Sequence, residues 1–214
     1  MTFWDFSAPF YDCAEHTNTA YDKMLQLMCD LIPEGAAVFE AAAGTGSISL
    51  AVAKKAKVVL CTDLSEKMLA VARRKAMRQS VGNISFDKRS IFDTGAQDGS
   101  FDVVIASQVL HLIDDPKKAA EELKRISGGM VIVSVALLKG LKGFFARPAV
   151  GIWKIFGFAP KREFDADSFH WFLYGIGLAP CEYKVVDGNM PMGVAVWRKA
   201  NVQQDENPRQ LQGQ

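Results

Sequence analysis

The stretch "VFEAAAGTGSISLAVA", residues 38–53, decides the fold of this chain. An apolar run ending in Glu40 precedes a turn of small residues with glycines at 44 and 46, and a second apolar run follows. The spacing predicts a short buried strand over 38–41, a tight turn, and a helix over 47–53 that Ser47 opens. Glycines in such a turn let backbone N–H groups approach a ligand at the start of the helix. The stretch therefore predicts a ligand site between a strand and a helix.

Three ligands suit such a turn: a nucleotide phosphate, a dinucleotide and another adenosine cofactor. A phosphate loop needs Lys and Ser/Thr after its last glycine, whereas Ser47 and Ile48 follow Gly46, so this ligand is excluded. A dinucleotide loop needs a third small residue where Ser49 stands, which is an imperfect match and leaves that alternative open. Glu40 would repel a pyrophosphate, and its charge suits a ligand with an ammonium group. The turn thus favours a cationic cofactor.

The composition is that of an ordinary soluble globular chain. It has 214 residues, of which 49% are hydrophobic and 23% charged, enough for one sizeable core and one domain. The net charge of +1 gives no reason to expect nucleic acid as a partner. The four cysteines are scattered without metal-ligand spacing, and no apolar run reaches the ~18 residues of a membrane span. We expect a cytoplasmic protein without a metal, with a disordered polar tail over 201–214.

Short apolar runs rich in branched residues alternate with helical patterns along the chain. Strands are predicted at 57–63, 83–89, 101–108 and 129–135, and helices at 65–79 and 116–126. This alternation predicts an α/β fold with a doubly wound, Rossmann-like sheet, helices on both faces and a ligand crevice at the strand carboxyl ends. After a helix at 165–175, the runs 178–186 and 192–199 around "DGNMP" predict an antiparallel pair at the sheet edge, for seven strands in all.

Asp63 ends the second predicted strand, 17 residues after Gly46. In such a fold an acid at this place accepts hydrogen bonds from ribose hydroxyls. The alternative is that Asp63 or Ser65 merely caps the helix that follows. The cofactor interpretation is favoured because the glycine turn lies on the neighbouring strand.

Four ordered motifs carry a family resemblance: "FEAAAGTGS", "CTDLSEKMLAVARRK", "DGSFDVVIASQVLHLIDDP" and "AAEELKRISGGMVIVS". Together they resemble the class I S-adenosylmethionine-dependent methyltransferases, especially the small-molecule type that includes ubiquinone and menaquinone biosynthesis enzymes. The resemblance runs from about Phe6 to Lys199. It implies S-adenosyl-L-methionine as the cofactor and a single class I methyltransferase domain over 1–200. Within this domain, it implies an N-terminal lid with helices over 1–34 and a substrate-side insertion over 136–164.

The resemblance also implies roles for the residues around the turn. Glu40, Gly44 and Gly46 would face the methionine part of the cofactor, and Asp63 would bind the ribose. Leu64 and Met68 would lie beside the adenine, with Ser107 and Gln108 bordering the methyl-donor end.

Two further positions bear on how the resemblance places the cofactor. Ser90 stands where the family often has an acid that accepts from the adenine amino group, and a hydroxyl can accept this bond without the charge. Ile91 beside it would add an apolar face and a backbone N–H. Tyr11, in "FSAPFYDC", would close over the cofactor; the alternative is an amphipathic cap packed on the core.

His111 is the best-placed candidate for a general base or a substrate contact. A sulfonium methyl donor is a strong electrophile, so in-line transfer needs mainly alignment and exclusion of water, and a base is optional. An acceptor that must lose a proton would use a histidine near the strand ends. The alternative for His111 is a helix-start residue satisfied by the backbone. Spacing singles out neither His16 nor His170.

The segment over 137–162 is basic and aromatic. It contains six Lys and Arg residues, no acid, and five interleaved Phe and Trp residues. Three interpretations stay open: a lid over an apolar substrate with Phe145 and Trp153 as contacts, a peripheral membrane contact, or a structural cap.

The predicted function is methyl transfer from S-adenosylmethionine, in line, to a small apolar or amphipathic acceptor. The alternatives are an NAD-dependent oxidoreductase and a non-catalytic S-adenosylmethionine-binding protein. Glu40 and the missing third glycine disfavour the oxidoreductase. The sequence indicates neither the acceptor atom nor the oligomeric state.

Overall fold

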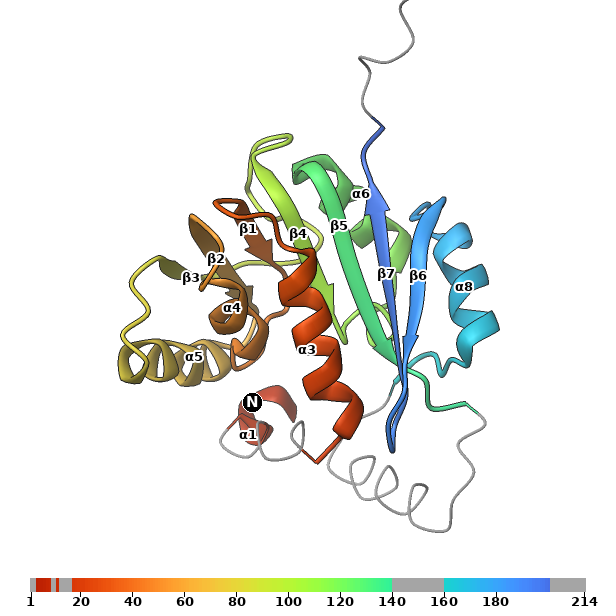
Figure 1. Ribbon diagram of the computed structural model, residues 1–214, viewed down its shortest axis with the longest axis horizontal. Helices are drawn as coiled ribbons and strands as arrows, with labels where there is room; N and C mark the ends of the chain where they lie inside the picture. The colour runs from red at the N-terminus through yellow and green to blue at the C-terminus, as the bar shows by residue number, and fades with distance from the viewer. Residues whose placement is uncertain (1–2, 9–10, 12–16, 140–159, 201–214) are drawn as a thin grey trace, which may run out of the picture.

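A seven-stranded sheet forms the centre of the computed structural model, which describes residues 3–8, 11, 17–139 and 160–200 (Figure 1). The strands are β1 (Ala37–Glu40), β2 (Val58–Asp63), β3 (Ile84–Lys88), β4 (Phe101–Ser107), β5 (Ser127–Ala136), β6 (Cys181–Val186) and β7 (Met192–Arg198). The helices are α1 (Phe3–Ser7), α3 (Thr19–Leu31), α4 (Ser47–Val52), α5 (Glu66–Arg78), α6 (Pro116–Ile126) and α8 (Ala166–Gly175). Each predicted strand and helix is present, with ends shifted by at most a few residues.

The strand order is β3-β2-β1-β4-β5-β7-β6. The first five strands pair in parallel, and β7 pairs antiparallel with both β5 and β6. The predicted doubly wound sheet with an antiparallel C-terminal pair is therefore confirmed. The hairpin does not simply extend the edge, because its second strand lies inside the sheet and its first strand, β6, forms the edge.

Side chains of the central strands alternate between two buried layers. In β4, Val103 and Ile105 pack in the layer with α3 and α4, whereas Val104 and Ala106 pack in the layer with α6 and α8. Such strands need apolar residues at every position, because helices cover both faces of a parallel sheet. This is why the sequence shows continuous apolar runs here.

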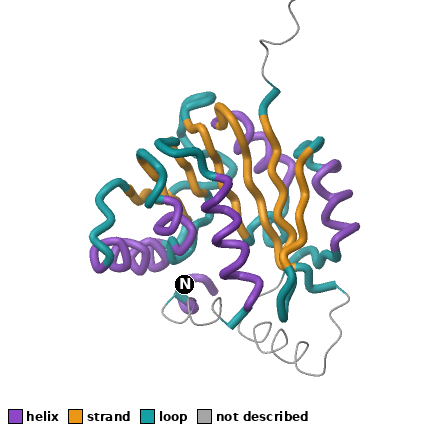
Figure 2. The backbone as a smooth tube through the Cα atoms, in the orientation of Figure 1, coloured by secondary structure: helices purple, strands orange, loops and turns teal. Residues whose placement is uncertain are grey.

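The helices cover the sheet in two groups. Figure 2 shows α3 and α4 in front of the strands, with α6 behind them, and α8 beside β6. Asp165 begins α8 with a capping box that it shares with Ser168, and Asn18 and Ser65 cap α3 and α5. None of the helices in the described ranges is long and apolar enough to cross a lipid bilayer.

Candidate cofactor cleft

A cleft opens at the carboxyl ends of β1 and β4, where a doubly wound sheet binds its ligands. It encloses about 310 Å³, counted with the part that is open to solvent. The residues that line it come from the N-terminal region, the turn after β1 and the end of β4: Tyr11, Tyr21, Glu40, Ala42, Ala43, Gly44, Ser47, Ile48, Ser107 and Gln108. The structure thus brings together five of the predicted site residues: Tyr11, Glu40, Gly44, Ser107 and Gln108.

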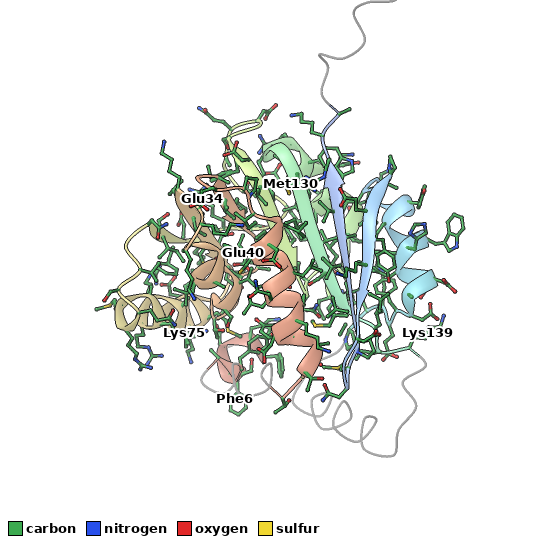
Figure 3. All side chains as sticks on the ribbon, viewed as in Figure 1. Phe6, Glu34, Glu40, Lys75, Met130 and Lys139 are labelled. Carbon is green, nitrogen blue, oxygen red and sulfur yellow. The ribbon has the colours of Figure 1, made fainter. Side chains whose placement is uncertain are left out.

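Glu40 is the buried acid of the cleft. It ends β1, is only 2% exposed, and its Oε2 accepts a hydrogen bond from the Ser49 hydroxyl (Figure 3). Its backbone carbonyl accepts from Thr62 Oγ1 at 2.9 Å, which ties β1 to β2. A carboxylate fixed in such a place favours a positively charged group of the ligand.

The two glycines of the turn differ in their surroundings. Both have left-handed φ angles, +56° at Gly44 and +73° at Gly46. Among the described residues, a Cβ on Gly44 would meet only Tyr11, at 3.9 Å, whereas a Cβ on Gly46 would lie 2.9 Å from the Cβ of Ala72 on α5. Gly44 therefore leaves backbone open to the cleft, and Gly46 allows α5 to pack closely against the turn.

Asp63 joins the turn to the start of α5. Its Oδ2 accepts from the Gly44 N–H at 2.8 Å, and its Oδ1 accepts from the Ser65 N–H at 2.7 Å. The N-cap of α5 is Ser65, whose hydroxyl accepts from the Met68 N–H. The pKa of Asp63 lies above its ordinary value, chiefly because the carboxyl group is buried. The backbone bonds from Ser65 and Gly44 offset part of this rise, and the nearby Asp5 charge adds to it. Ser65 therefore caps α5, while the Asp63 carboxylate bonds to the backbone on either side, including Gly44 of the cleft lining.

The four residues predicted beside the adenine follow two neighbouring strands: Leu64 and Met68 come after β2, and Ser90 and Ile91 come after β3. Leu64 is 60% exposed, whereas the Met68 side chain is only 1% exposed. Ser90 Oγ accepts from the Phe92 N–H at 3.2 Å, and Ile91 is buried. Of these four residues, Leu64 presents the largest apolar surface to solvent at the carboxyl end of β2.

Three polar side chains form a network at the ends of β4 and β5. The hydroxyls of Ser107 and Ser134 lie 2.7 Å apart, and Gln108 Nε2 donates to Ser134 Oγ at 3.1 Å. The Gln108 N–H also donates to the Ser134 carbonyl at 2.8 Å. No described residue donates a hydrogen bond to Gln108 Oε1, so this network leaves one acceptor at the wall of the cleft.

Two non-glycine residues that line the cleft have left-handed backbones. The φ angle is +51° at Ala42 and +56° at Gln108. Such residues carry strain of order 1–3 kcal/mol each, which the surrounding structure must hold in place. Strain of this kind concentrates at functional sites, in agreement with a ligand cleft here.

The N-terminal region closes one side of the cleft. Asp5 of α1 accepts from the Ser65 hydroxyl at 2.7 Å, and Trp4 makes an edge-to-face contact with Tyr11 at 6.2 Å between ring centroids. Tyr21 of α3 is only 3% exposed and lines the cleft, although the sequence analysis did not identify it. The buried positions 20, 21, 24 and 28 mark the inner face of α3, and this periodicity was the available signal.

Lys75 is a second residue that the sequence analysis missed. Its Nζ lies 2.9 Å from the Ser47 hydroxyl and 3.5 Å from the Thr45 hydroxyl, so α5 places a cation against the glycine turn (Figure 3). Ser47 also lines the cleft. The cleft thus has an acid, Glu40, and a cation that contacts one of its lining hydroxyls.

His111 lies in the turn after β4 and is not among the residues that line the cleft. It is 3% exposed, and its Nδ1 is buried without a hydrogen-bond partner in the described part of the chain. Burial lowers the pKa of this imidazole from 6.5 to about 4, so it is neutral at pH 7. The backbone carbonyl of His111 accepts from the N–H groups of Lys161 and Arg162.

The basic aromatic segment ends at this turn, and its start bonds to Phe164, just after its end. Lys139 N–H donates to the Phe164 carbonyl at 2.9 Å, and Arg162 Nη1 donates to the Ile113 carbonyl at 2.8 Å. Phe145 and Trp153, the predicted substrate contacts, lie outside the described residues, as does the tail over 201–214.

The methyltransferase domain family matches residues 39–133 of the chain. A demethylmenaquinone methyltransferase of Clavibacter sepedonicus is 34% identical over 157 residues, which are 72% of this chain and 54% of that protein. The chain belongs to the class I S-adenosylmethionine-dependent methyltransferases. A ubiquinone biosynthesis O-methyltransferase of Xanthomonas campestris is 32% identical over 140 residues, 63% of this chain and 56% of that protein.

The fold also resembles that of a solved structure. The crystal structure of a SAM dependent methyltransferase from Aquifex aeolicus matches with a TM-score of 0.61 and 20% identity, covering 82% of this chain and 88% of that one. The chain spans about half the length of the curated relatives described above. The match to the domain family covers the end of β1 with Glu40, the turn with Gly44, the strands β2 to β4 and most of β5.

Proposed function

We propose that this chain transfers the methyl group of S-adenosyl-L-methionine to a small apolar or amphipathic acceptor. The observation that carries the proposal is the contact of Gly44 with Asp63 beside a cleft that Glu40 lines. These residues fit the cofactor: Glu40 suits its ammonium group, the open backbone at Gly44 suits its close approach, and Asp63 suits its ribose hydroxyls.

The bound cofactor supplies an electrophilic methyl group on a sulfonium. What the chain must contribute is alignment of the acceptor and exclusion of water. Tyr11 and Tyr21 close the N-terminal side of the cleft, and the Ser107–Gln108 end of β4 offers polar atoms toward the acceptor. We keep His111 as the proposed substrate contact or base, since a neutral imidazole can accept a proton; because its side chain is buried outside the cleft lining, this role requires the acceptor to reach into the turn after β4.

The acceptor class rests on two further points. The relatives described above are named for menaquinone and ubiquinone chemistry, and the segment over 137–162 combines aromatic with basic residues. We propose that this segment contacts an apolar or amphipathic acceptor, with a peripheral membrane contact as the alternative. An NAD-dependent oxidoreductase finds no support among these relatives.

Binding calorimetry tests the cofactor. The protein should bind S-adenosylmethionine and S-adenosylhomocysteine, and Asp63→Ala should weaken both about 10- to 150-fold, since a charged acceptor bond contributes about 1.5–3 kcal/mol. Ser65→Ala is the matched control, because it removes the α5 cap and leaves Asp63 in place. Binding of NADH without any S-adenosylmethionine signal would refute the proposal.

A methyl-transfer screen tests the acceptor. Quinones, phenols, thiols, amines and lipids would each be incubated with S-adenosylmethionine, and formation of S-adenosylhomocysteine would be measured. Turnover with an apolar or amphipathic acceptor is expected. Tight cofactor binding without turnover on any of these classes would favour a non-catalytic binding protein instead.

A further inference from the structure

The turn between β6 and β7, residues 187–191, forms hydrogen bonds with the start of α3, about 170 residues away in the chain. Asn189 Oδ1 accepts from the Thr19 N–H at 2.8 Å, and Asn189 Nδ2 donates to the Thr17 carbonyl at 3.0 Å. Lys23 Nζ donates to the Asp187 carbonyl at 3.2 Å. Figure 1 shows the tip of the hairpin beside the lower end of α3, near the carboxyl ends of β4 and β5.

These contacts satisfy the first turn of α3. The first N–H groups of a helix lack partners within the helix and need other acceptors. Asn18 Oδ1 accepts the Ala20 N–H at 3.0 Å, while Asn189 accepts the Thr19 N–H. The same Asn18 side chain, only 4% exposed, donates through Nδ2 to the Met190 carbonyl at 3.0 Å. One buried amide therefore joins the helix start to the turn.

The fit between the turn and the helix is tight. A Cβ on Gly188 would lie 2.5 Å from the backbone nitrogen of Ala20 and 2.7 Å from its Cβ. Gly188 thus allows the turn to approach the helix backbone directly. A helix start held this closely has little freedom to shift along or about its axis.

The turn is itself fixed by the sheet. Val186 and Met192 are the register partners that close the hairpin, and β7 pairs with β5 along its length. The Leu137 N–H, at the end of β5, donates to the Pro191 carbonyl at 2.8 Å. The sheet therefore holds the turn, and the turn holds the first turn of α3.

Tyr21 connects this arrangement to the cleft. It lies two residues after Thr19, in the first turn of α3, and it lines the cleft together with Glu40, Gly44 and Ser47. A shift of the helix start would move the Tyr21 ring with it. The position of that ring is therefore linked to the contacts that the hairpin turn makes with the first turn of α3.

We infer that Asn189 is a positioning residue for the cofactor cleft, holding the first turn of α3 so that Tyr21 closes the cleft. The inference rests on the proposed function, since the cleft is taken to bind S-adenosylmethionine. It assigns a role in cofactor binding to the turn between β6 and β7.

Calorimetry with S-adenosylhomocysteine tests the inference. Asn189→Ala should weaken binding roughly tenfold, within the range over which distant packing changes alter a binding site. Asn189→Asp should retain most of the affinity, because its Oδ1 still accepts the Thr19 N–H. In a Tyr21→Leu background, which already lacks the ring, Asn189→Ala should cause little further loss.

Two matched controls separate positioning from general stability. Asn83→Ala removes a comparable amide, which donates to the Ala53 and Ala56 carbonyls, and should lower stability without weakening binding. Gly188→Ala should weaken binding as Asn189→Ala does, whereas Gly82→Ala should not, because no atom of the described residues lies within 4 Å of a Cβ added there.

Unchanged affinity in Asn189→Ala, or additive losses in the double variant with Tyr21→Leu, would overturn the inference. Hydrogen exchange of the free protein gives a second, ligand-independent result: amides of residues 19–24 should exchange faster in Asn189→Ala than in Asn83→Ala. If the unaltered protein binds neither S-adenosylhomocysteine nor S-adenosylmethionine, the proposed cofactor is wrong. The exchange comparison then decides alone whether Asn189 holds α3, and equal exchange would refute it.

Discussion

Replacing His111 with leucine should remove a specific part of the pH dependence of stability. The imidazole is 3% exposed, its Nδ1 has no partner among the described residues, and its pKa falls from 6.5 to about 4 on burial. A lowered histidine pKa means that the unfolded chain binds a proton before the folded one does. The contribution of neutral His111 is therefore complete above pH 6.5 and is lost as the pH falls from 6.5 to 4.

The size of this effect follows from the two pKa values. Each pH unit between them corresponds to about 1.4 kcal/mol, so the loss is on the order of 3 kcal/mol. Near pH 7.5, His111→Leu should change the free energy of unfolding by no more than about 1 kcal/mol, because no hydrogen bond to Nδ1 is lost. Between pH 6.5 and 4, the unaltered protein should lose about 3 kcal/mol more than the variant.

Urea unfolding at a series of pH values, followed by tryptophan fluorescence, measures this difference. Val109→Ala is a suitable control, because it perturbs a buried side chain of the same loop and carries no titratable group. Its unfolding free energy should differ from that of the unaltered protein by the same amount at every pH. Parallel pH curves for the unaltered protein and His111→Leu would refute the placement of a buried neutral imidazole in this turn.

Three further predictions concern the cleft. Lys75→Met should weaken S-adenosylhomocysteine several-fold and leave methylthioadenosine unchanged, because only the former has a carboxylate for this cation to attract; equal calorimetric losses would contradict this. Gln108→Gly should raise thermal stability by relieving the left-handed backbone, a gain of about 1 kcal/mol, and should weaken cofactor binding, whereas Ser134→Ala should weaken binding and lower stability, because it removes the hydroxyl that bonds Ser107 and Gln108. Asp5→Asn should lower the Asp63 pKa, so that cofactor affinity falls at a lower pH than in the unaltered protein; identical pH profiles would exclude coupling of these carboxylates.

The sequence predicted the strands and the helices between them because the signal is local. Continuous apolar runs such as the one in β4 need burial on both faces, and the residues 65–79 and 116–126 have helical periodicity with capping residues at their starts. The turn after β1 was also predictable, since Gly44 and Gly46 have the left-handed angles that favour glycine.

Other parts of the site depend on contacts between distant residues. Tyr21 lines the cleft from α3, whose start contacts the hairpin turn about 170 residues away, and Lys75 of α5 contacts Ser47 of the glycine turn. The insertion of β7 between β5 and β6 depends on pairing that a hairpin pattern alone does not specify. Burial of His111 likewise follows from the packing around it and has no local sequence signal, whereas Met68 shares the buried face of α5 with Ala72 and Ala76.

Because β7 lies inside the sheet, the sheet cannot be completed during translation until this strand has left the ribosome. Val131, Val133 and Val135 of β5 emerge early, yet their antiparallel partners Trp197, Ala195 and Gly193 come from the last strand. Until β7 is synthesised, the edge of β5 opposite β4 has unpaired backbone N–H and C=O groups, and such an open edge is prone to pair with other chains. Nascent chains stalled before residue 192 should therefore recruit chaperones or aggregate, and stalls that expose residue 198 with the turn outside the exit tunnel should not.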